Sequence, residues 1–456
     1  MSSAACIKLE EIGNPEHRLK YTVGIIGCNR VGILHACLFA KAGFKVLCGD
    51  SNQAIVNDLS KGRTLHLKSE LEPLLRAQLK EGRLKVSSDI SLTASSSEIV
   101  MFTAPATVND KGEPDYSDLE RALRQAGPGI RKGTLVIIVG IVKIGATDGF
   151  VRDVLESVSG LRSGLDFFLA YSPVVHSEDQ NLKTLSCYRR VVAASDRQSL
   201  EIASRVLETI SQVDVIRTTD VKTAEALALF QSVYAHVSQG VSRELAIICE
   251  KMGVDYFAVS ALGDPLFPLP LDRWNSNCEA LKLLFADADN LGVKLKILET
   301  VEESNNETLK HVFRLVNEAL KECGKTLRRA KISIIGASKT PNTVDAPKVI
   351  VKELIKLLES KGAKISLYDP YLSGKTLAEF RISTIIKRSL AEALEHSDCI
   401  IIAAGHDQIK RLNVKRLKLM MRMPAAVVDL EGALDPLKLK VEGLVYKGFG
   451  RGVTAR

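Results

Sequence analysis

The sequence predicts an α/β protein built from two doubly wound parallel sheets, joined by a long central helix and a small helical domain. Short apolar runs bounded by glycine alternate with helical segments through the first half of the chain, and the same alternation returns after residue 328. Continuous apolar runs of this kind suit strands that helices cover on both faces. We therefore expect two separate α/β domains.

The expected strands are short and alternate with helical segments, which is the pattern of a parallel sheet with crossover helices. In the first domain they lie at residues 23–26, 45–47, 99–102, 134–139, 167–169, 190–192 and 213–216. In the second domain they lie at residues 331–335, 365–369, 400–403 and 426–429. A helix is expected from about residue 347 to residue 361.

One apolar stripe between the two domains predicts a helix of about thirty residues. Its members recur every three or four positions, and they are Ala226, Leu229, Val233, Val237, Val241, Leu245, Ile248 and Met252. A helix of this length is unusual inside one globular domain, so we interpret it as a connection that also offers a subunit interface. The expected domain boundaries are 20–217, 218–325 and 326–456.

Length and charge exclude several classes of protein. A chain of 456 residues is too long for one small binding module. The 62 basic and 54 acidic residues give a net charge of +8, which is spread along the chain without a block of five or six like charges. We therefore expect neither a nucleic-acid nor a membrane partner.

Cysteine usage and the start of the chain predict a cytoplasmic protein. The nine cysteines are odd in number, scattered and never spaced as C-x-x-C, which favours neither a disulfide framework nor a metal site. The first twenty residues contain Glu10, Glu11 and Glu16 and lack the apolar stretch of a signal peptide. The longest apolar run, residues 135–142, is too short for a membrane helix.

A glycine turn at residues 27–32 follows the first strand and opens an apolar helix. A Rossmann-like dinucleotide site needs glycines for the tight turn and the helix packing, and an acid after the next strand for the ribose. Gly27, Gly32 and Asp50 fit, but Asn29 stands where the second glycine is expected. The candidate NAD-binding residues are these four and Val31. The alternative is a structural turn whose pocket the Asn29 side chain fills.

Further motifs follow in a fixed order, at residues 72–73, 109–115, 166–173, 339–345, 368–371, 405–407 and 446–452. Together with the glycine turn they resemble the UDP-glucose/GDP-mannose dehydrogenase family, in particular its UDP-N-acetylmannosamine dehydrogenase-like branch, from about residue 20 to residue 452. The resemblance implies an NAD-binding domain, a helical dimerisation domain and a C-terminal domain that binds a nucleotide sugar. It also implies oxidation of the C6 alcohol of a UDP-sugar to the uronate with two NAD, as in polysaccharide biosynthesis.

The chemistry that the resemblance implies requires a nucleophilic cysteine and a lysine and asparagine that stabilise oxyanions. At the matching positions this chain has Pro268, Ala228 and Ser232. Val174 replaces a family glutamate and Arg243 a family asparagine. The loop at residues 140–145 departs from the family pattern, and the arginine before residue 347 is deleted. The sequence therefore favours a catalytically impaired paralogue.

Four residues are candidates for relocated catalytic groups: Lys143, His176, Asp272 and Cys278. Residues 275–277 could cap a helix that places Cys278 in its first turn, where the helix dipole lowers a thiol pKa. Lys143 and His176 fall in loops that the family places beside the cofactor, and the alternative for both is a solvated loop residue.

In the C-terminal part, Lys339 and Arg451 lie next to glycine-rich turns and are candidate contacts for the nucleotide sugar. His406 and Asp407 belong to a family motif with a structural or ligand-lining role.

Two alternatives to an impaired paralogue stay open. One is an active UDP-sugar dehydrogenase with relocated catalytic groups. The other is a two-electron NAD dehydrogenase that needs no cysteine and uses Lys143 or His176 as its base. The expected assembly is a homodimer, or a heteromer with an active paralogue.

Overall fold

The computed structural model describes residues 7–64, 68–104, 106–109, 114–175, 181–263, 278–338, 341–342, 348–372 and 385–452. The chain divides into two compact units. The first comprises Met1–Val233 and Glu279–Lys294, and the second comprises Tyr234–Cys278 and Leu295–Arg456. The helices that lie between β10 and β11 in the sequence are thus divided between the two units.

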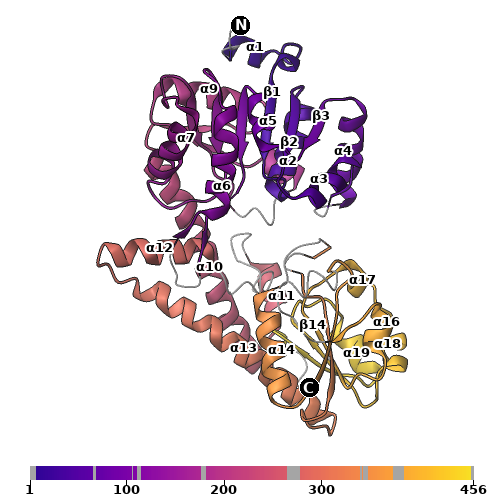
Figure 1. Cartoon of the computed structure of the whole chain (residues 1–456). Coiled ribbons are helices and arrows are strands. Elements are labelled where there is room, and N and C mark those ends of the chain that lie inside the picture. The colour runs from indigo at the N-terminus through magenta and orange to yellow at the C-terminus, as the bar shows by residue number, and fades with distance from the viewer. Residues whose placement is uncertain are drawn as a thin grey trace. The chain divides into compact units, whose positions relative to one another are not determined.

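The first unit contains an eight-stranded sheet in the order β10-β9-β8-β7-β4-β1-β2-β3 (Figure 1). All neighbours are parallel except β8 and β9. Its strands are β1 (Thr22–Ile26), β2 (Lys45–Gly49), β3 (Leu84–Ser87), β4 (Ile99–Phe102), β7 (Leu135–Ile138), β8 (Phe168–Tyr171), β9 (Val191–Ala193) and β10 (Ile216–Thr218). A separate antiparallel pair joins β5 (Thr107–Val108) and β6 (Pro114–Asp115).

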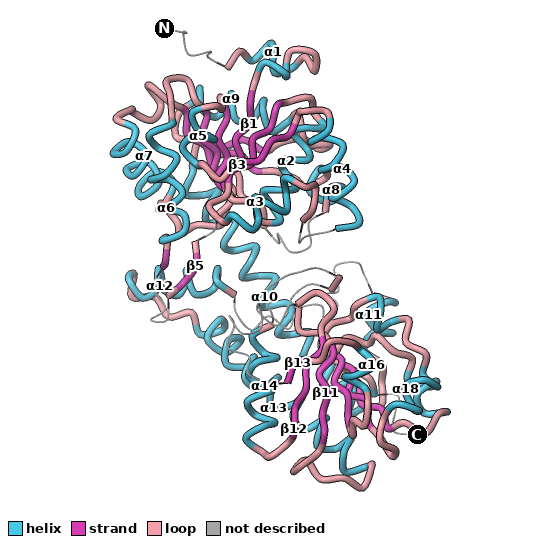
Figure 2. The backbone as a smooth tube through the Cα atoms, turned by 45° about the vertical axis from the view of Figure 1, so that its right-hand side comes forward, coloured by secondary structure: helices cyan, strands magenta, loops and turns pink. Residues whose placement is uncertain are grey.

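Helices surround this sheet on both faces (Figure 2). The helices of this unit are α1 (Leu9–Gly13), η1 (Arg18–Lys20), α2 (Arg30–Lys41), α3 (Gln53–Ser60), α4 (Lys68–Lys80), α5 (Ile90–Ser95), α6 (Ser117–Ala126), η2 (Gly127–Gly129), η3 (Thr147–Val151), α7 (Arg152–Ser159), α8 (Leu182–Ser186), α9 (Arg197–Glu208) and α12 (Glu279–Asn290), of which α12 packs against β5 and not against the sheet. Neighbouring strand residues belong to different cores: Ile25 packs into one apolar cluster and Ile26 into the other. This alternation explains why the strands read as continuous apolar runs.

The second unit contains a six-stranded parallel sheet in the order β13-β12-β11-β14-β15-β16. Its strands are β11 (Lys331–Ile335), β12 (Lys364–Tyr368), β13 (Ile385–Ile386), β14 (Cys399–Ile402), β15 (Ala426–Asp429) and β16 (Val445–Gly448). Its helices are α11 (Tyr256–Leu262), α13 (Lys296–Glu322), α14 (Val349–Ser360), α16 (Leu390–Leu394), α17 (Asp407–Lys410), α18 (Val414–Met420) and α19 (Pro436–Val441). The predicted fold class, with two parallel sheets, is confirmed.

Two predicted elements differ in part from the structure. The strand expected at residues 213–216 is instead β10 (Ile216–Thr218), because the edge strand pairs with β9 from Ile216 onward and Val213 is exposed. The long helix is confirmed as α10 (Val221–Met252), but its predicted stripe is not one surface. Leu229 and Val233 are buried, whereas Val241 is exposed.

The exposed apolar series of α10 begins on a different face of the helix. Its members are Leu227, Phe230, Tyr234, Val241, Leu245, Ile248 and Met252. They recur at helical spacing along the length of α10 and form its exposed apolar face, which shares its last four members with the predicted stripe.

The described residues contain neither a membrane-spanning helix nor a disulfide. No helix among them is long and apolar enough to cross a membrane. None of the cysteines within the described ranges forms a disulfide.

Candidate functional site

The turn between β1 and α2 has the backbone geometry of a dinucleotide-binding loop. Gly27 has a φ of +95°, which L side chains rarely adopt, and its N–H donates to the Gly49 carbonyl at 2.9 Å. A Cβ on Gly32 would lie 2.1 Å from the Gly27 carbonyl oxygen. The Thr103 hydroxyl donates to that same oxygen at 2.7 Å. Both glycines are therefore required by close backbone packing, as predicted for the turn and the helix approach.

The Asn29 side chain occupies the N-terminus of α2. Its Oδ1 accepts a hydrogen bond from the Gly32 N–H at 3.0 Å, and its Nδ2 donates to the Thr103 carbonyl at 3.0 Å. Helix N-termini in such folds bind pyrophosphate through free N–H groups. Asn29 thus acts as an N-cap. It occupies the Gly32 N–H, which could otherwise donate a hydrogen bond to a cofactor phosphate.

The Asp50 carboxylate follows β2 and is only partly buried. Its Oδ2 accepts the Cys28 N–H and its Oδ1 accepts the Asn52 N–H, both at 2.8 Å. Each carboxylate oxygen can accept a further hydrogen bond, so Asp50 fits the role of ribose acceptor while it holds the glycine turn. Val31 is nearly buried in the first turn of α2. The five predicted cofactor residues therefore gather at one turn.

The second unit repeats this arrangement. The Gly336 N–H donates to the Tyr368 carbonyl at 2.8 Å, and the Ala337 N–H donates to Asp369 Oδ2 at 2.7 Å. Gly336 has a φ of +83° and follows β11, while Asp369 follows β12. Asp369 was not among the predicted site residues. The available signal was a glycine after one strand, Gly336, and an acid after the next strand, Asp369.

Asp369 is the centre of a buried polar network. Its Oδ2 also accepts from the Ser338 hydroxyl at 2.7 Å and lies 3.2 Å from His406 Nε2. Because His406 Nδ1 accepts the Asn342 N–H at 2.9 Å, the ring proton is on Nε2 and faces Asp369. Burial alone would raise the pKa of Asp369, but the hydrogen bonds from His406 and from Ala337 and Ser338 hold it well below its usual range. His406 thus has a structural role in this network.

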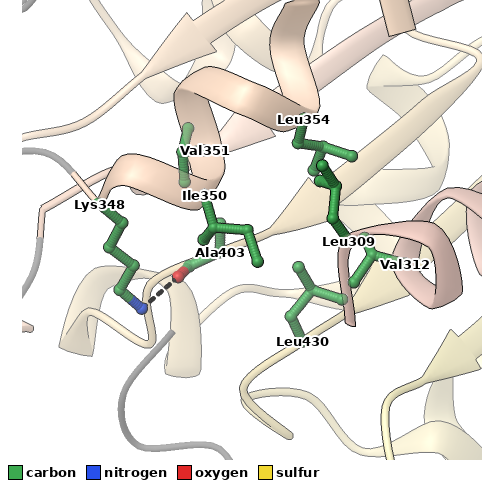
Figure 3. Close-up of a pocket in the computed structure, with 8 residues that line it drawn as sticks. All are labelled: Leu309, Val312, Lys348, Ile350, Val351, Leu354, Ala403 and Leu430. Atoms are coloured by element: carbon green, nitrogen blue, oxygen red, sulfur yellow. Dashed lines mark hydrogen bonds between the residues drawn. The ribbon is translucent and has the colours of Figure 1, made fainter. Parts of the chain in front are cut away.

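A buried ion pair links the strand ends of the second unit. Lys348 Nζ donates to the Ala403 carbonyl at 2.7 Å (Figure 3). The same Nζ donates to Glu431 Oε1 at 2.6 Å. The two side chains are 1% and 7% exposed. The apolar residues beside Lys348 enclose a cavity of only about 10 Å³. This space is at the lower limit for one water and is no ligand site.

Arg451 is engaged within the protein. Its guanidinium pairs with Asp255 and lies 4.3 Å from the ring centre of Phe257. Nη2 also donates to the Gly432 carbonyl at 3.5 Å, while Nε is buried without a partner. These contacts fix Arg451 against α11. The other candidate nucleotide-sugar contact, Lys339, lies outside the described residues.

The family's lysine and asparagine positions lie on α10. Ala228 is fully buried and Ser232 is half-buried. One turn before Ala228, the buried Glu225 carboxylate accepts the N–H groups of Gly145 at 2.5 Å and Thr147 at 2.8 Å. Burial raises the pKa of this carboxyl. Glu225, which sequence reasoning did not select, thus anchors the loop at residues 140–147 and is signalled only by its acidic residue type on an apolar helix face.

Of the four candidates for relocated catalytic groups, the structure describes Lys143 and Cys278. Lys143 Nζ pairs with Asp287 Oδ1 of α12 at 2.7 Å. Cys278 immediately precedes α12, so it does not occupy the first helical turn that the sequence suggested. His176 and Asp272 lie outside the described residues, as does Pro268. Within the described ranges, no group of His, Cys, Asp and Glu could hold a metal ion.

Two glycine turns on parallel sheets, each closed by an acid, define a protein with two Rossmann-like nucleotide-binding domains. Residues 21–211 match the NAD binding domain of the UDP-glucose/GDP-mannose dehydrogenase family, and residues 333–436 match its UDP binding domain. The chain belongs to this family. The predicted family resemblance is confirmed, and its first domain is an NAD-binding domain, in agreement with the predicted cofactor.

Known relatives match nearly the whole chain at low identity. UDP-N-acetyl-D-mannosamine dehydrogenase of Pyrococcus horikoshii is 23% identical over 438 residues, covering 94% of this chain and 99% of the relative. UDP-N-acetyl-D-glucosamine 6-dehydrogenase of Pseudomonas aeruginosa is 23% identical over 424 residues, covering 91% and 97%. The solved structure of UDP-D-ManNAc dehydrogenase from P. horikoshii has a TM-score of 0.80 at 22% identity, covering 95% and 100%. These likenesses establish a shared fold.

Replacing Asn29 with glycine is expected to tighten NAD binding about tenfold, because it releases the Gly32 N–H for the cofactor, and one hydrogen bond to a charged group is worth roughly 1.5–3 kcal/mol. Glycine at an N-cap costs only a few tenths of a kcal/mol, so the fold should be retained. Asn52→Gly is the matched control, because Asn52 caps α3 through the Ala54 N–H at the same 3.0 Å. Calorimetric titration with NAD measures both variants. Unchanged or weaker binding by Asn29→Gly would contradict the prediction.

Proposed function

We propose that this chain is a catalytically impaired nucleotide-sugar dehydrogenase, which binds NAD and a UDP-sugar but does not carry the C6 alcohol through to the carboxylate. The observation that supports this most is on α10. The position where the family resemblance expects a lysine is Ala228, whose methyl group is fully buried. No ammonium can reach a developing oxyanion from there.

The missing groups matter because the reaction removes two hydrides in succession. The second hydride leaves from a thiohemiacetal, so a thiolate must first capture the intermediate aldehyde. Charge on the reacting oxygen then needs fixed donors, and removing one such donor typically costs roughly 10²–10³-fold in rate. Ala228 and Ser232 supply neither an ammonium nor an amide, and the Lys143 ammonium already pairs with Asp287. These features support loss of the four-electron reaction.

The test combines binding and turnover on the purified full chain. Calorimetry with NAD and with a panel of UDP-sugars should detect both ligands, while NADH absorbance should stay flat with every sugar. Formation of two NADH per UDP-sugar would overturn the proposal in favour of an active dehydrogenase with relocated groups. One NADH per sugar would establish the two-electron alternative. Failure to bind either ligand would leave only a scaffold role.

The exposed apolar face of α10 supports assembly with a second copy or with an active paralogue. Tyr234 is 75% exposed, Ile248 53% and Met252 70%, and they share one helix face. Exposed apolar faces of this extent mark interaction surfaces in soluble proteins. We infer a dimer that buries this face.

Ile248→Glu is expected to dissociate this dimer, because it would place a charge in the centre of the apolar contact. Light scattering coupled to size exclusion measures the mass, which should fall to that of one 49.7 kDa chain. Leu437→Glu is the matched control, since Leu437 is 66% exposed on α19, outside the α10 face. An unchanged mass for Ile248→Glu would argue against this interface.

A further inference from the structure

Basic residues are concentrated in one segment of the second unit. Residues 408–428 contain six basic residues and no acidic one, while the net charge of the whole chain is +8. The six are Lys410, Arg411, Lys415, Arg416, Lys418 and Arg422. The expectation of an even spread of charge is therefore wrong for this segment, which covers α17 and α18.

A groove with a volume of about 470 Å³ opens beside this segment, between α16 on one side and α17 and α18 on the other. These helices lie on the same side of the sheet (Figure 1). Three arginines from three separate elements line it: Arg388 before α16, Arg411 after α17 and Arg416 in α18. The lining also offers polar groups from Ser389 and Asn413, and it includes no acidic residue.

The three groove arginines form no ion pair within the described ranges, whereas three basic residues near them do. Lys387 pairs with Glu392 at 3.3 Å, Lys418 with Glu442 at 3.5 Å and Arg422 with Asp398 at 3.7 Å. Glu392, the acid nearest to Arg388 in sequence, accepts the Arg388 backbone N–H at 3.1 Å and the Lys387 ammonium. The Arg388 backbone N–H, the Lys387 ammonium and the Arg388 charge lower the pKa of Glu392, so this carboxylate lies near Arg388 without an ion pair to its guanidinium.

The backbone that carries these arginines is held by local hydrogen bonds. Asn413 Oδ1 accepts the N–H groups of Lys415 at 3.0 Å and Arg416 at 3.3 Å. Ser389 Oγ accepts the Glu392 N–H at 3.2 Å. A groove with fixed walls loses less conformational entropy when a ligand binds.

We propose that this groove is a binding site for a small molecule that carries at least two phosphate groups. Guanidinium groups recognise phosphate oxygens through paired hydrogen bonds, and three of them suit more than one phosphate. The volume lies within the usual range for small-molecule sites. The groove lies between α16, α17 and α18, but Tyr368 ends β12 and Arg388 follows β13, so the test has to separate it from a nucleotide bound at the loops after the strands. The proposal is independent of whether the chain is catalytically impaired.

The experiment titrates the full chain calorimetrically with inorganic pyrophosphate, in the presence of saturating NAD and UDP. One pyrophosphate site should persist under these conditions. Arg411→Gln/Arg416→Gln should weaken its affinity at least tenfold. The matched control is Arg189→Gln/Arg197→Gln, which removes the same charge from two exposed arginines of the first unit. The control should bind pyrophosphate as the wild type does.

Two results would overturn the proposal. Pyrophosphate binding that disappears when NAD and UDP are added would assign the signal to the cofactor or nucleotide-sugar sites. Equal weakening in both double variants would reduce it to non-specific charge attraction. Thermal unfolding of each variant shows that the fold is intact, so a loss of affinity reports on the groove.

Discussion

Replacing Lys348 with methionine is expected to lower the free energy of unfolding by about 3–5 kcal/mol, which is the usual cost of removing one partner from a buried ion pair. The Lys348 ammonium lies 2.6 Å from Glu431 Oε1, and both side chains are nearly inaccessible to water. Methionine would remove the Lys348 ammonium from the buried Glu431 carboxylate. The cavity beside Lys348, about 10 Å³, has no room for the several waters that would solvate a carboxylate (Figure 3).

The loss would extend to the strand ends that Lys348 connects. Its backbone N–H donates to the Ala337 carbonyl after β11, its ammonium binds the Ala403 carbonyl after β14, and Glu431 follows β15. Lys348 thus contacts three neighbouring strand ends beside the second glycine turn, and its side chain connects two of them, those of β14 and β15. The destabilisation should therefore appear in the unfolding of the second unit, which urea titration followed by circular dichroism measures.

Two variants separate this effect from a simple loss of a cation. Lys348→Met/Glu431→Met should recover most of the lost stability, because replacing both members of a buried pair by apolar residues is often nearly neutral. Lys310→Met should cost less than about 1 kcal/mol, since the Lys310–Glu307 pair has the same 2.6 Å separation but both side chains are exposed by more than 60%. Equal costs for Lys348→Met and Lys310→Met would refute the argument from burial.

Lys348 also illustrates what sequence patterns cannot predict. A lysine after a proline at the start of a helix is ordinarily interpreted as solvent-exposed, and Glu431 is 83 residues away in sequence. Only the parallel sheet brings the two together, because β14 and β15 are neighbours and both end at the same edge. The contacts of Asp369 with Ser338 and His406 were missed for the same reason, since these residues come from loops after separate strands, although Asp369 alone had a sequence signal.

The patterns that did predict structure are those with a local physical cause. Continuous apolar runs predicted the central strands because their residues alternate between two buried faces, as Ile25 and Ile26 do. The glycine turn was predictable because its backbone requirements are specific to glycine. The stripe on α10 was only half correct, since periodicity identifies a helix but does not say which of two apolar faces packs inside. In α10, Leu229 is buried and Phe230, the next residue, is exposed.

Replacing Gly32 with alanine is expected to lower the free energy of unfolding by about 1–3 kcal/mol, the usual cost of overpacking, and to weaken NAD binding at least tenfold. The added Cβ would lie 2.1 Å from the Gly27 carbonyl oxygen and 3.3 Å from Ile25 Cγ2. A backbone oxygen cannot rotate away as a side chain can, so α2 must move away from β1. That movement displaces the N–H groups of the first turn from the position where a helix N-terminus binds phosphate.

Gly149→Ala is the matched control in the same unit, because a Cβ there meets no atom within 4 Å, and alanine in this helical segment should keep the stability or raise it by up to about 1 kcal/mol. Urea unfolding and calorimetric NAD titration on both variants and the wild type give the comparison. If Gly32→Ala bound NAD as tightly as the wild type, the first turn of α2 would not be the phosphate site. The opposite responses expected for Gly32→Ala and Asn29→Gly make the pair decisive. Gly32→Ala closes the approach to the N-terminus of α2, and Asn29→Gly opens it.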